Sequence, residues 1–293
     1  MNYENLSLYN QWLDFQKQCL EKLLTDISGK NNDEISFLYF EYYLRVLPSV
    51  KYEVFNSNEL LKNPLYDKFK NVIDKIISDA KSGISLKPYL SKGIKKITKP
   101  DKMLNDWGIV HFHLGDSINS DGFIKRTGEL LFAYRDEKLN PNKLYFLDIH
   151  HHGEWSKKRT VEILHNNWKN SIEHYKIKGL VDIKPKLNDE EHLAMRNADI
   201  NSAIVLDDGT SYITLGGGMT TAGTNQEATM LKINYMNYFR DLELNILKQY
   251  NIKKEQLVLK IDKYNSYIYL NIPYLSEIKK VIYLNDIIVL DCI

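Results

Sequence analysis

Three strand-type segments follow one another in the middle of the chain, and they constrain the fold more than any other feature. They cover residues 108–114, 129–135 and 143–149, and each is rich in β-branched or aromatic side chains. A turn sequence, Asn140-Pro141-Asn142, separates the last two segments. Sequential strands joined by loops, without an intervening helix, pair as an antiparallel meander. The sequence therefore predicts a central antiparallel sheet.

Helical patterns lie on both sides of these strands. Apolar residues at spacings of three and four form a stripe over residues 7–24, and Cys19 lies on it. Asp33 is the expected cap of a second helix that Pro48 halts, and Ser57 is the expected cap of a third helix with an apolar face reaching Ile77. Further helices are predicted over residues 157–175, 189–198 and 226–250.

The C-terminal part mixes helices with strands. A hairpin is predicted over residues 203–215, and strands over 257–262, 267–272 and 280–290. The fold class predicted from this order is α+β. It comprises a helical region (1–95), a histidine-rich antiparallel β region (96–176) and a C-terminal α+β region (177–293).

Composition excludes several classes of protein. The 293 residues are 43% hydrophobic and 26% charged, which is typical of a globular chain. No run of 18 apolar residues exists, so no membrane partner is expected, and the first residues lack the features of a secretory signal. Cys19 and Cys292 cannot form a disulfide framework, so a reducing cytoplasm is the expected location. A net charge of +1 excludes a uniformly basic nucleic-acid coat.

One local segment is nevertheless basic. Residues 84–102 contain six lysines and a single aspartate, and Lys95 and Lys96 lie within this segment. It is predicted to be a solvated linker or an exposed arm, or alternatively a strip that faces phosphates.

The histidines are concentrated in one part of the sequence. All eight occur between His111 and His192, and five form the clusters His111-Phe112-His113 and His150-His151-His152. The two-residue period of a strand places His111 with His113, and His150 with His152, on one face. If the strands pair in one sheet, four imidazoles converge at one edge.

Three interpretations of these imidazoles remain open. The first is acid–base cleavage of a phosphodiester without metal or another cofactor, because imidazoles titrate near neutral pH. The second is a metal-dependent hydrolase or nuclease, in which Asp116 or Asp148 adds a carboxylate ligand. The third is a non-enzymatic interaction or sensor module in which the histidines are structural.

In the first interpretation, each residue has an expected role. His113 and His152 transfer protons, with His111 and His150 beside them, and Arg126 holds the phosphate. RNA would be bound and steered by cations on both sides of the clusters: Lys95, Lys96, Arg135, Lys157 and Arg159.

The order of features over residues 108–155 resembles the RelE/YoeB/YafQ superfamily of bacterial toxin ribonucleases. The motifs that carry the resemblance are His111-Phe112-His113-Leu114-Gly115, Asp121-Gly122-Phe123-Ile124-Lys125-Arg126, Leu130-Leu131-Phe132-Ala133-Tyr134-Arg135, and the run from Leu144 to Trp155. The resemblance implies a metal-independent endoribonuclease, a toxin or defence effector that acts on RNA or the ribosome and is held by an antitoxin or another inhibitory protein. His113 matches the early histidine, Arg126 the phosphate-side arginine and His152 the late general acid. Unlike members of that family, this chain is neutral and carries long additional segments on both sides.

Three other features have two possible roles each. Gly216-Gly217-Gly218 is predicted to be a flexible loop, or alternatively a phosphate contact. Trp155 and Trp168 are predicted core aromatics, or alternatively platforms for stacking bases. Cys19 is predicted to be a buried thiol rather than a nucleophile.

Overall fold

The computed structural model describes residues 6–23, 27–135, 140–154, 157–179, 183–262, 267–271 and 278–283. Its contacts group the chain into two compact units, each built from separate stretches of sequence, whereas the sequence predicts three consecutive regions. One unit combines residues 1–48, 95–98 and 228–293, and the other combines 49–94 and 99–227. Helices and strands occur in both, which confirms the α+β class.

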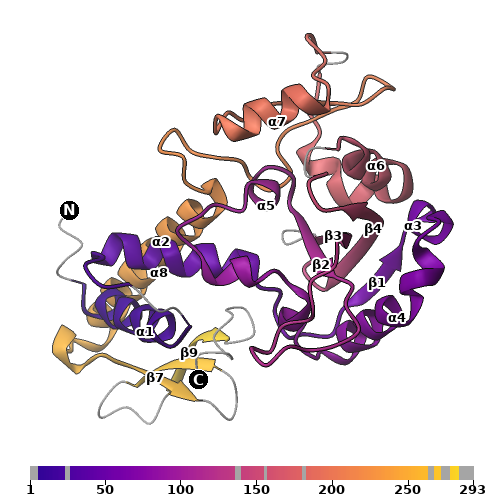
Figure 1. Cartoon of the computed structure of the whole chain (residues 1–293). Coiled ribbons are helices and arrows are strands. Elements are labelled where there is room, and N and C mark those ends of the chain that lie inside the picture. The colour runs from indigo at the N-terminus through magenta and orange to yellow at the C-terminus, as the bar shows by residue number, and fades with distance from the viewer. Residues whose placement is uncertain are drawn as a thin grey trace. The chain divides into compact units, whose positions relative to one another are not determined.

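The second unit contains a four-stranded sheet in the order β1-β4-β3-β2 (Figure 1). Its strands are β1 (Glu53–Asn56), β2 (Ile109–His113), β3 (Glu129–Arg135) and β4 (Lys143–His151). The predicted antiparallel meander is present, because β2 pairs with β3 and β3 with β4 in antiparallel fashion. The sequence did not predict β1, which pairs with β4 in parallel. Strand β4, which carries His150, therefore has a neighbour on each side.

The helices of this unit begin at caps that the sequence partly predicts. Ser57 caps α3 (Asn58–Lys62) and Asn188 caps α7 (Asp189–Asn197) through side-chain bonds to backbone amides. The prediction of one long helix after Ser57 is wrong, because α3 ends before Pro64 and a separate helix, α4 (Tyr66–Ser82), follows. The remaining helices are α5 (Lys102–Trp107) and α6 (Arg159–Ile172).

The main core of the second unit lies on one face of the sheet. Alternate residues of β3, namely Leu130, Phe132 and Tyr134, share this core with Val161 and Leu164 of α6. The other face carries Phe112 and Phe146, whose ring centroids are 6.0 Å apart. Both faces of the sheet are thus apolar along most of their length, as expected for a buried sheet.

Short elements complete the second unit. The predicted hairpin over 203–215 forms two-residue strands, β5 (Ile204–Val205) and β6 (Ser211–Tyr212). A 3₁₀ turn, η4 (Glu173–Tyr175), follows α6.

The basic segment 84–102 is not a fully exposed arm. It contains two 3₁₀ turns, η2 (Lys87–Tyr89) and η3 (Lys92–Lys95). Its apolar residues Tyr89, Leu90, Ile94 and Ile97 are buried. Lys92, Lys95, Lys96 and Lys99 face solvent, as in an anchored surface segment.

The first unit combines helices with a small sheet. Helices α1 (Ser7–Leu23), α2 (Asn32–Arg45) and α8 (Gln226–Tyr250) are close to the predicted ranges. The cap of α2 is Asn31, not Asp33, because the Asn31 side chain accepts a bond from the Glu34 amide and Glu34 bonds back to the Asn31 amide. Cys19 is buried on α1, as predicted.

The small sheet consists of β7 (Val258–Asp262), β8 (Tyr267–Asn271) and β9 (Ile278–Tyr283), in that order. A 3₁₀ turn, η5 (Lys254–Gln256), precedes β7. The predicted last strand through Leu290 is described only as far as Tyr283, and Cys292 lies outside the described residues. Within the described ranges, no helix has the length and apolar character needed to cross a bilayer.

Candidate functional site

The two histidine clusters meet on one face of the four-stranded sheet. His113 of β2 is paired with Leu130 of β3, and Leu130 is paired with His150 of β4. In the next row, His111 is paired with Phe132. Directly paired residues point to the same face, so His111, His113 and His150 share the face that carries the main core.

Aromatic contacts place the rings on either side of β3. The ring centroids of His111 and His113 are 6.1 Å apart, and those of His111 and Phe132 are 6.5 Å apart. The ring centroids of His150 and Phe132 are 4.7 Å apart. Because neighbouring strands are about 4.8 Å apart, the backbones at His113 and His150 are separated by about 10 Å.

Burial distinguishes the five histidines. His113 and His150 are only 2% and 8% exposed. They are buried because the sheet face that carries them is also the core face. His151 and His152 are exposed at the end of β4, and His111 is half-buried.

Several buried imidazole nitrogens lack a hydrogen-bond partner among the described residues. In the two clusters these are both ring nitrogens of His113 and the Nε2 atom of His150, and outside the clusters the Nε2 atom of His192 is another. A buried polar atom without a partner costs about 1–3 kcal/mol, so such atoms are rare in folded proteins and call for a physical explanation. A bound molecule that supplies the missing bonds would give one.

The pKa values of these imidazoles are displaced downward. Burial, together with His111, Arg126 and His152, lowers the pKa of His113 to about 4. Burial also lowers the pKa of His111, with Asp101 opposing and His152 and Arg126 adding to the effect. His152 and Arg126 thus both lie within electrostatic reach of His111 and His113. His111 and His113 are therefore neutral at pH 7.

A tight loop returns the chain from β2 to Arg126. The Leu114 amide donates to Thr127 Oγ1 at 3.0 Å, and the Lys125 amide donates to the Ser117 carbonyl at 2.8 Å. Gly115 allows this close approach, since an added Cβ atom would collide with the carbonyl oxygen of Lys125. Arg126 itself is exposed next to the end of β2.

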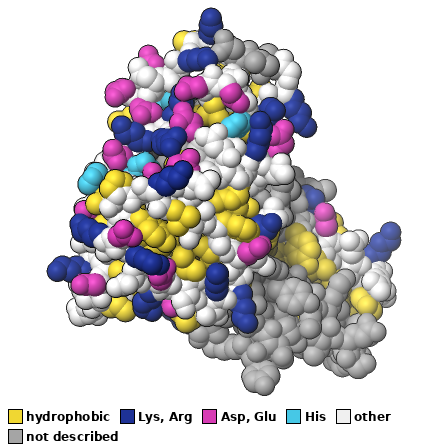
Figure 2. Space-filling model, turned by 90° about the vertical axis from the view of Figure 1, so that its right-hand side faces the viewer, with side chains coloured by type: hydrophobic (Ala, Val, Ile, Leu, Met, Phe, Trp, Pro, Cys, Tyr) yellow, Lys and Arg dark blue, Asp and Glu magenta, His cyan; other side chains and the backbone are white. Residues whose placement is uncertain are grey.

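Of the other predicted RNA-binding cations, Lys157 lies within electrostatic reach of His150 and Glu154. Arg135 is 7% exposed, so its side chain is enclosed, and its predicted role in binding RNA stays a prediction. Lys157 Nζ lies 3.8 Å from Asp189 Oδ2, and Arg159 Nη2 lies 3.6 Å from Glu59 Oε1, so each cation has an acidic neighbour. Basic and acidic side chains are interspersed on the face drawn in Figure 2, without a continuous basic strip.

Lys95 and Lys96 are exposed, as the sequence predicts. They belong to the first unit, whereas the histidines belong to the second. Their predicted contact with the same substrate stays a prediction.

The glycine loop does not offer free amides to a phosphate. The amides of Gly216 and Gly218 donate to the carbonyls of Asp106 and Asn105, and the Gly217 amide donates to the Thr214 carbonyl. The alternative prediction of a phosphate contact is therefore wrong, because these donors already serve to attach the loop to α5.

Trp168 behaves as the core prediction expects. Its ring lies 4.9 Å from that of Tyr145 and packs against the edge of the main core. The prediction for Trp155 falls outside the described residues.

One residue next to the histidines, Glu154, is not predicted from the sequence. Glu154 Oε2 lies 3.4 Å from His150 Nδ1 and accepts a hydrogen bond from the His151 amide at 3.0 Å. The signal was its position, four residues after His150, where a turn at the end of the strand brings it back to the ring. Within the described residues, no group of three or more His, Cys, Asp or Glu side chains has the arrangement of a metal site.

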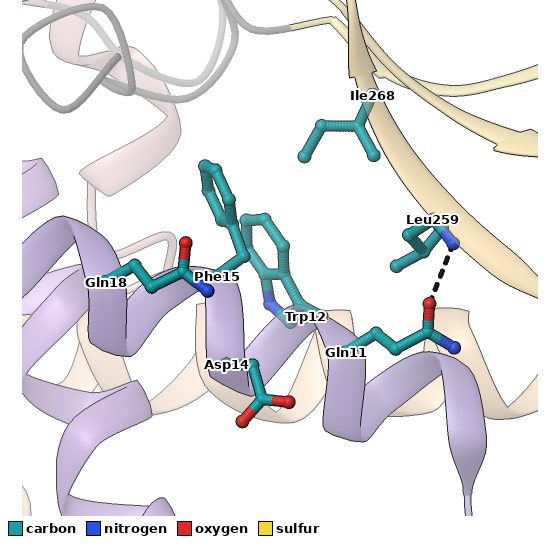
Figure 3. Close-up of a pocket in the computed structure, with 7 residues that line it drawn as sticks. All are labelled: Gln11, Trp12, Asp14, Phe15, Gln18, Leu259 and Ile268. Atoms are coloured by element: carbon teal, nitrogen blue, oxygen red, sulfur yellow. Dashed lines mark hydrogen bonds between the residues drawn. The ribbon is translucent and has the colours of Figure 1, made fainter.

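A cavity of about 240 Å³ lies in the first unit, where the sequence predicted no site. Its walls come from α1, β7 and β8 (Figure 3), and its lining residues are Gln11, Trp12, Asp14, Phe15, Gln18, Leu259 and Ile268. The lining contains a single ionisable side chain, that of Asp14, and no histidine. It therefore lacks the acid–base groups that the histidine face provides.

Comparisons with protein-family models, curated proteins and solved structures found no match for this chain. The resemblance to the RelE/YoeB/YafQ superfamily therefore depends on the sequence motifs alone.

Proposed function

We propose that this chain is an endoribonuclease that cleaves RNA by acid–base catalysis without a metal ion. The observation that supports this most is the grouping of His111, His113, His152 and Arg126 at one end of the sheet. It combines neutral imidazoles, an exposed imidazole and an exposed guanidinium, which are the groups that such a reaction uses.

The roles follow from burial and charge. Arg126 is exposed, so its guanidinium can hold the scissile phosphate through two parallel hydrogen bonds. His152 is exposed, its amide donates to the carbonyl of Gly128, two residues after Arg126, and it is the candidate proton donor to the leaving oxygen. The proton acceptor is one of the neutral imidazoles on the sheet face.

The biological setting belongs to the same proposal. A cytoplasmic toxin or defence effector, restrained by an antitoxin or similar inhibitory protein, agrees with the sequence resemblance. RNA alone or RNA on the ribosome would be its substrate.

The test is cleavage of a single-stranded RNA oligonucleotide by the purified chain in the presence of EDTA. The expected products carry a 2′,3′-cyclic phosphate and a 5′-hydroxyl, and a 2′-deoxy nucleotide at the cleavage site should block the reaction. His152→Ala and Arg126→Ala should each lower the rate by about 10²- to 10⁴-fold. His174→Ala is the matched control, because His174 is another exposed histidine and lies in η4.

Two outcomes would contradict the proposal. Cleavage that requires added zinc or manganese would favour a metal-dependent hydrolase. Absence of cleavage under both conditions would favour an interaction module with structural histidines.

A further inference from the structure

A turn at the end of β4 brings a carboxylate to His150. The Glu154 amide donates to the His151 carbonyl at 3.2 Å, and the Glu154 side chain accepts from the His151 amide at 3.0 Å. These two bonds fix both the backbone and the side chain of Glu154. Glu154 Oε2 then lies 3.4 Å from His150 Nδ1, long for a hydrogen bond but within the range of an ion pair.

This contact determines which nitrogen of His150 carries the proton. A carboxylate beside Nδ1 favours the tautomer with a proton on Nδ1, which leaves a lone pair on Nε2. Nε2 is buried and has no hydrogen-bond partner among the described residues. The ring also packs against Phe132, which limits its rotation.

The charges around His150 differ from those around His113. Burial lowers the pKa of both residues. At His150 the carboxylates of Asp148 and Glu154 oppose this effect and Lys157 adds to it. At His113 the neighbouring groups are Arg126 and two imidazoles, and all of them lower the pKa further. The carboxylates beside His150 therefore favour its protonated form, whereas the groups beside His113 disfavour it.

We propose that Glu154 is a positioning residue that holds His150 as the proton acceptor of the site. This inference rests on the proposed function. His150 Nε2 is enclosed on the core face, so the reaction requires RNA binding to open this face to the 2′-hydroxyl. The 2′-hydroxyl oxygen then attacks phosphorus while its proton passes to His150 Nε2. The bond from phosphorus to the 5′-oxygen breaks, and the leaving oxygen takes a proton from the donor, His152. A cyclic phosphate and a 5′-hydroxyl form, with no net gain or loss of protons.

The first test measures the tautomer of His150 without any substrate. In protein with ¹⁵N-labelled histidine, NMR should show His150 with a protonated Nδ1 and an unprotonated Nε2, and the His150→Gln variant identifies the signals. Glu154→Ala should convert these signals into those of a tautomer mixture. Glu129→Gln is the matched control, because Glu129 is another carboxylate near the end of the sheet and is paired with Lys68.

The second test measures RNA cleavage against pH. Glu154→Ala should lower kcat by about 10- to 100-fold with little change in KM, the range typical of groups that orient a histidine. Glu154→Gln keeps an acceptor oxygen but removes the charge, so the acidic limb of the kcat profile should move to lower pH. Glu154→Asp, which keeps the charge on a shorter side chain, should recover part of kcat.

The outcomes separate this inference from the proposed function. If the wild-type chain cleaves RNA but Glu154→Ala changes neither the tautomer nor the acidic limb, the positioning role is wrong and the function stands. If the chain cleaves no RNA, the function and the acceptor role both fail, and the tautomer measurement alone decides whether Glu154 positions His150.

Discussion

His113 and His150 lie in one row of the sheet, on strands that flank β3 on either side. Both are buried on the core face, and both present ring nitrogens without a partner among the described residues. The sheet therefore holds two neutral imidazoles at a fixed separation.

Stability should depend on pH through His113. An unfolded histidine titrates near pH 6.5, whereas burial lowers the pKa of folded His113 to about 4. Between these values the unfolded state binds more protons, so the free energy of unfolding falls as the pH drops from about 6.5 to 4. Urea unfolding should give a lower free energy of unfolding at pH 5 than at pH 7. In His113→Gln, the difference between the two pH values should be smaller by about 1–2 kcal/mol. An unchanged pH dependence in the variant would show that other groups cause the loss.

Gly115→Ala should separate Arg126 from the histidines. The added methyl group would collide with the Lys125 carbonyl, so the loop must shift. We expect RNA cleavage to fall at least tenfold while circular dichroism of the chain stays the same, since a small misplacement of a substrate-holding group is costly. Gly128→Ala is the matched control, because a Cβ atom at Gly128 meets nothing within 4 Å. Equal activity of the two variants would argue against a role for the loop.

The buried ion pair between α5 and α7 should contribute strongly to stability. Arg196 Nε lies 2.8 Å from Asp106 Oδ2, and the two side chains are 3% and 10% exposed. The guanidinium carbon of Arg196 lies 4.2 Å from the centroid of the Trp107 ring. Arg196→Met would leave the Asp106 carboxylate buried without its partner, at a cost of about 3–5 kcal/mol in the free energy of unfolding. Lys70→Met breaks the half-exposed pair with Asp74 and should cost less than about 1 kcal/mol. Similar losses in urea unfolding of the two variants would contradict this assignment.

Gln11 should protect the open edge of β7. Its Nε2 atom donates to the Leu257 carbonyl, and its Oε1 atom accepts from the Leu259 amide, both at 2.8 Å. The amide thus occupies backbone groups that a further strand would otherwise pair with. Gln11→Ala should lower the free energy of unfolding by about 1–3 kcal/mol and increase self-association measured by light scattering. Gln18→Ala on the same helix should change neither, and an equal effect of both variants would refute the protective role.

The central sheet of the second unit could be predicted because the composition of three of its segments indicates strands. Strands β2, β3 and β4 are rich in aromatic and β-branched residues, and their pairing followed from their order. Strand β1 has only four residues, Glu53–Asn56, and its parallel pairing depends on contacts with β4 that lie far along the chain. The break at Pro64 was visible in the sequence but was outweighed by the apolar stripe on either side of it.

The site was predictable in part for the same reason. The period of two placed His111 and His113 on one face, and the meander brought His150 to the same face. The predicted common face of His150 and His152 does not form, because β4 ends at His151. Their burial could not be inferred, because it depends on which face α6 and the rest of the core cover. Glu154 was missed, since its contact with His150 depends on a turn and not on strand periodicity.

The parallel pairing of β1 with β4 joins residues ninety positions apart, from Glu53 with Lys143 to Asn56 with Phe146. Such distant contacts form slowly in folding, because a long loop must close before they are made. The strand that bears His150 is thereby completed only when the early and middle parts of this unit have met. Nascent or truncated chains that lack this pairing would leave β4 with one neighbour, so assembly of the imidazole row is coupled to folding of the whole unit.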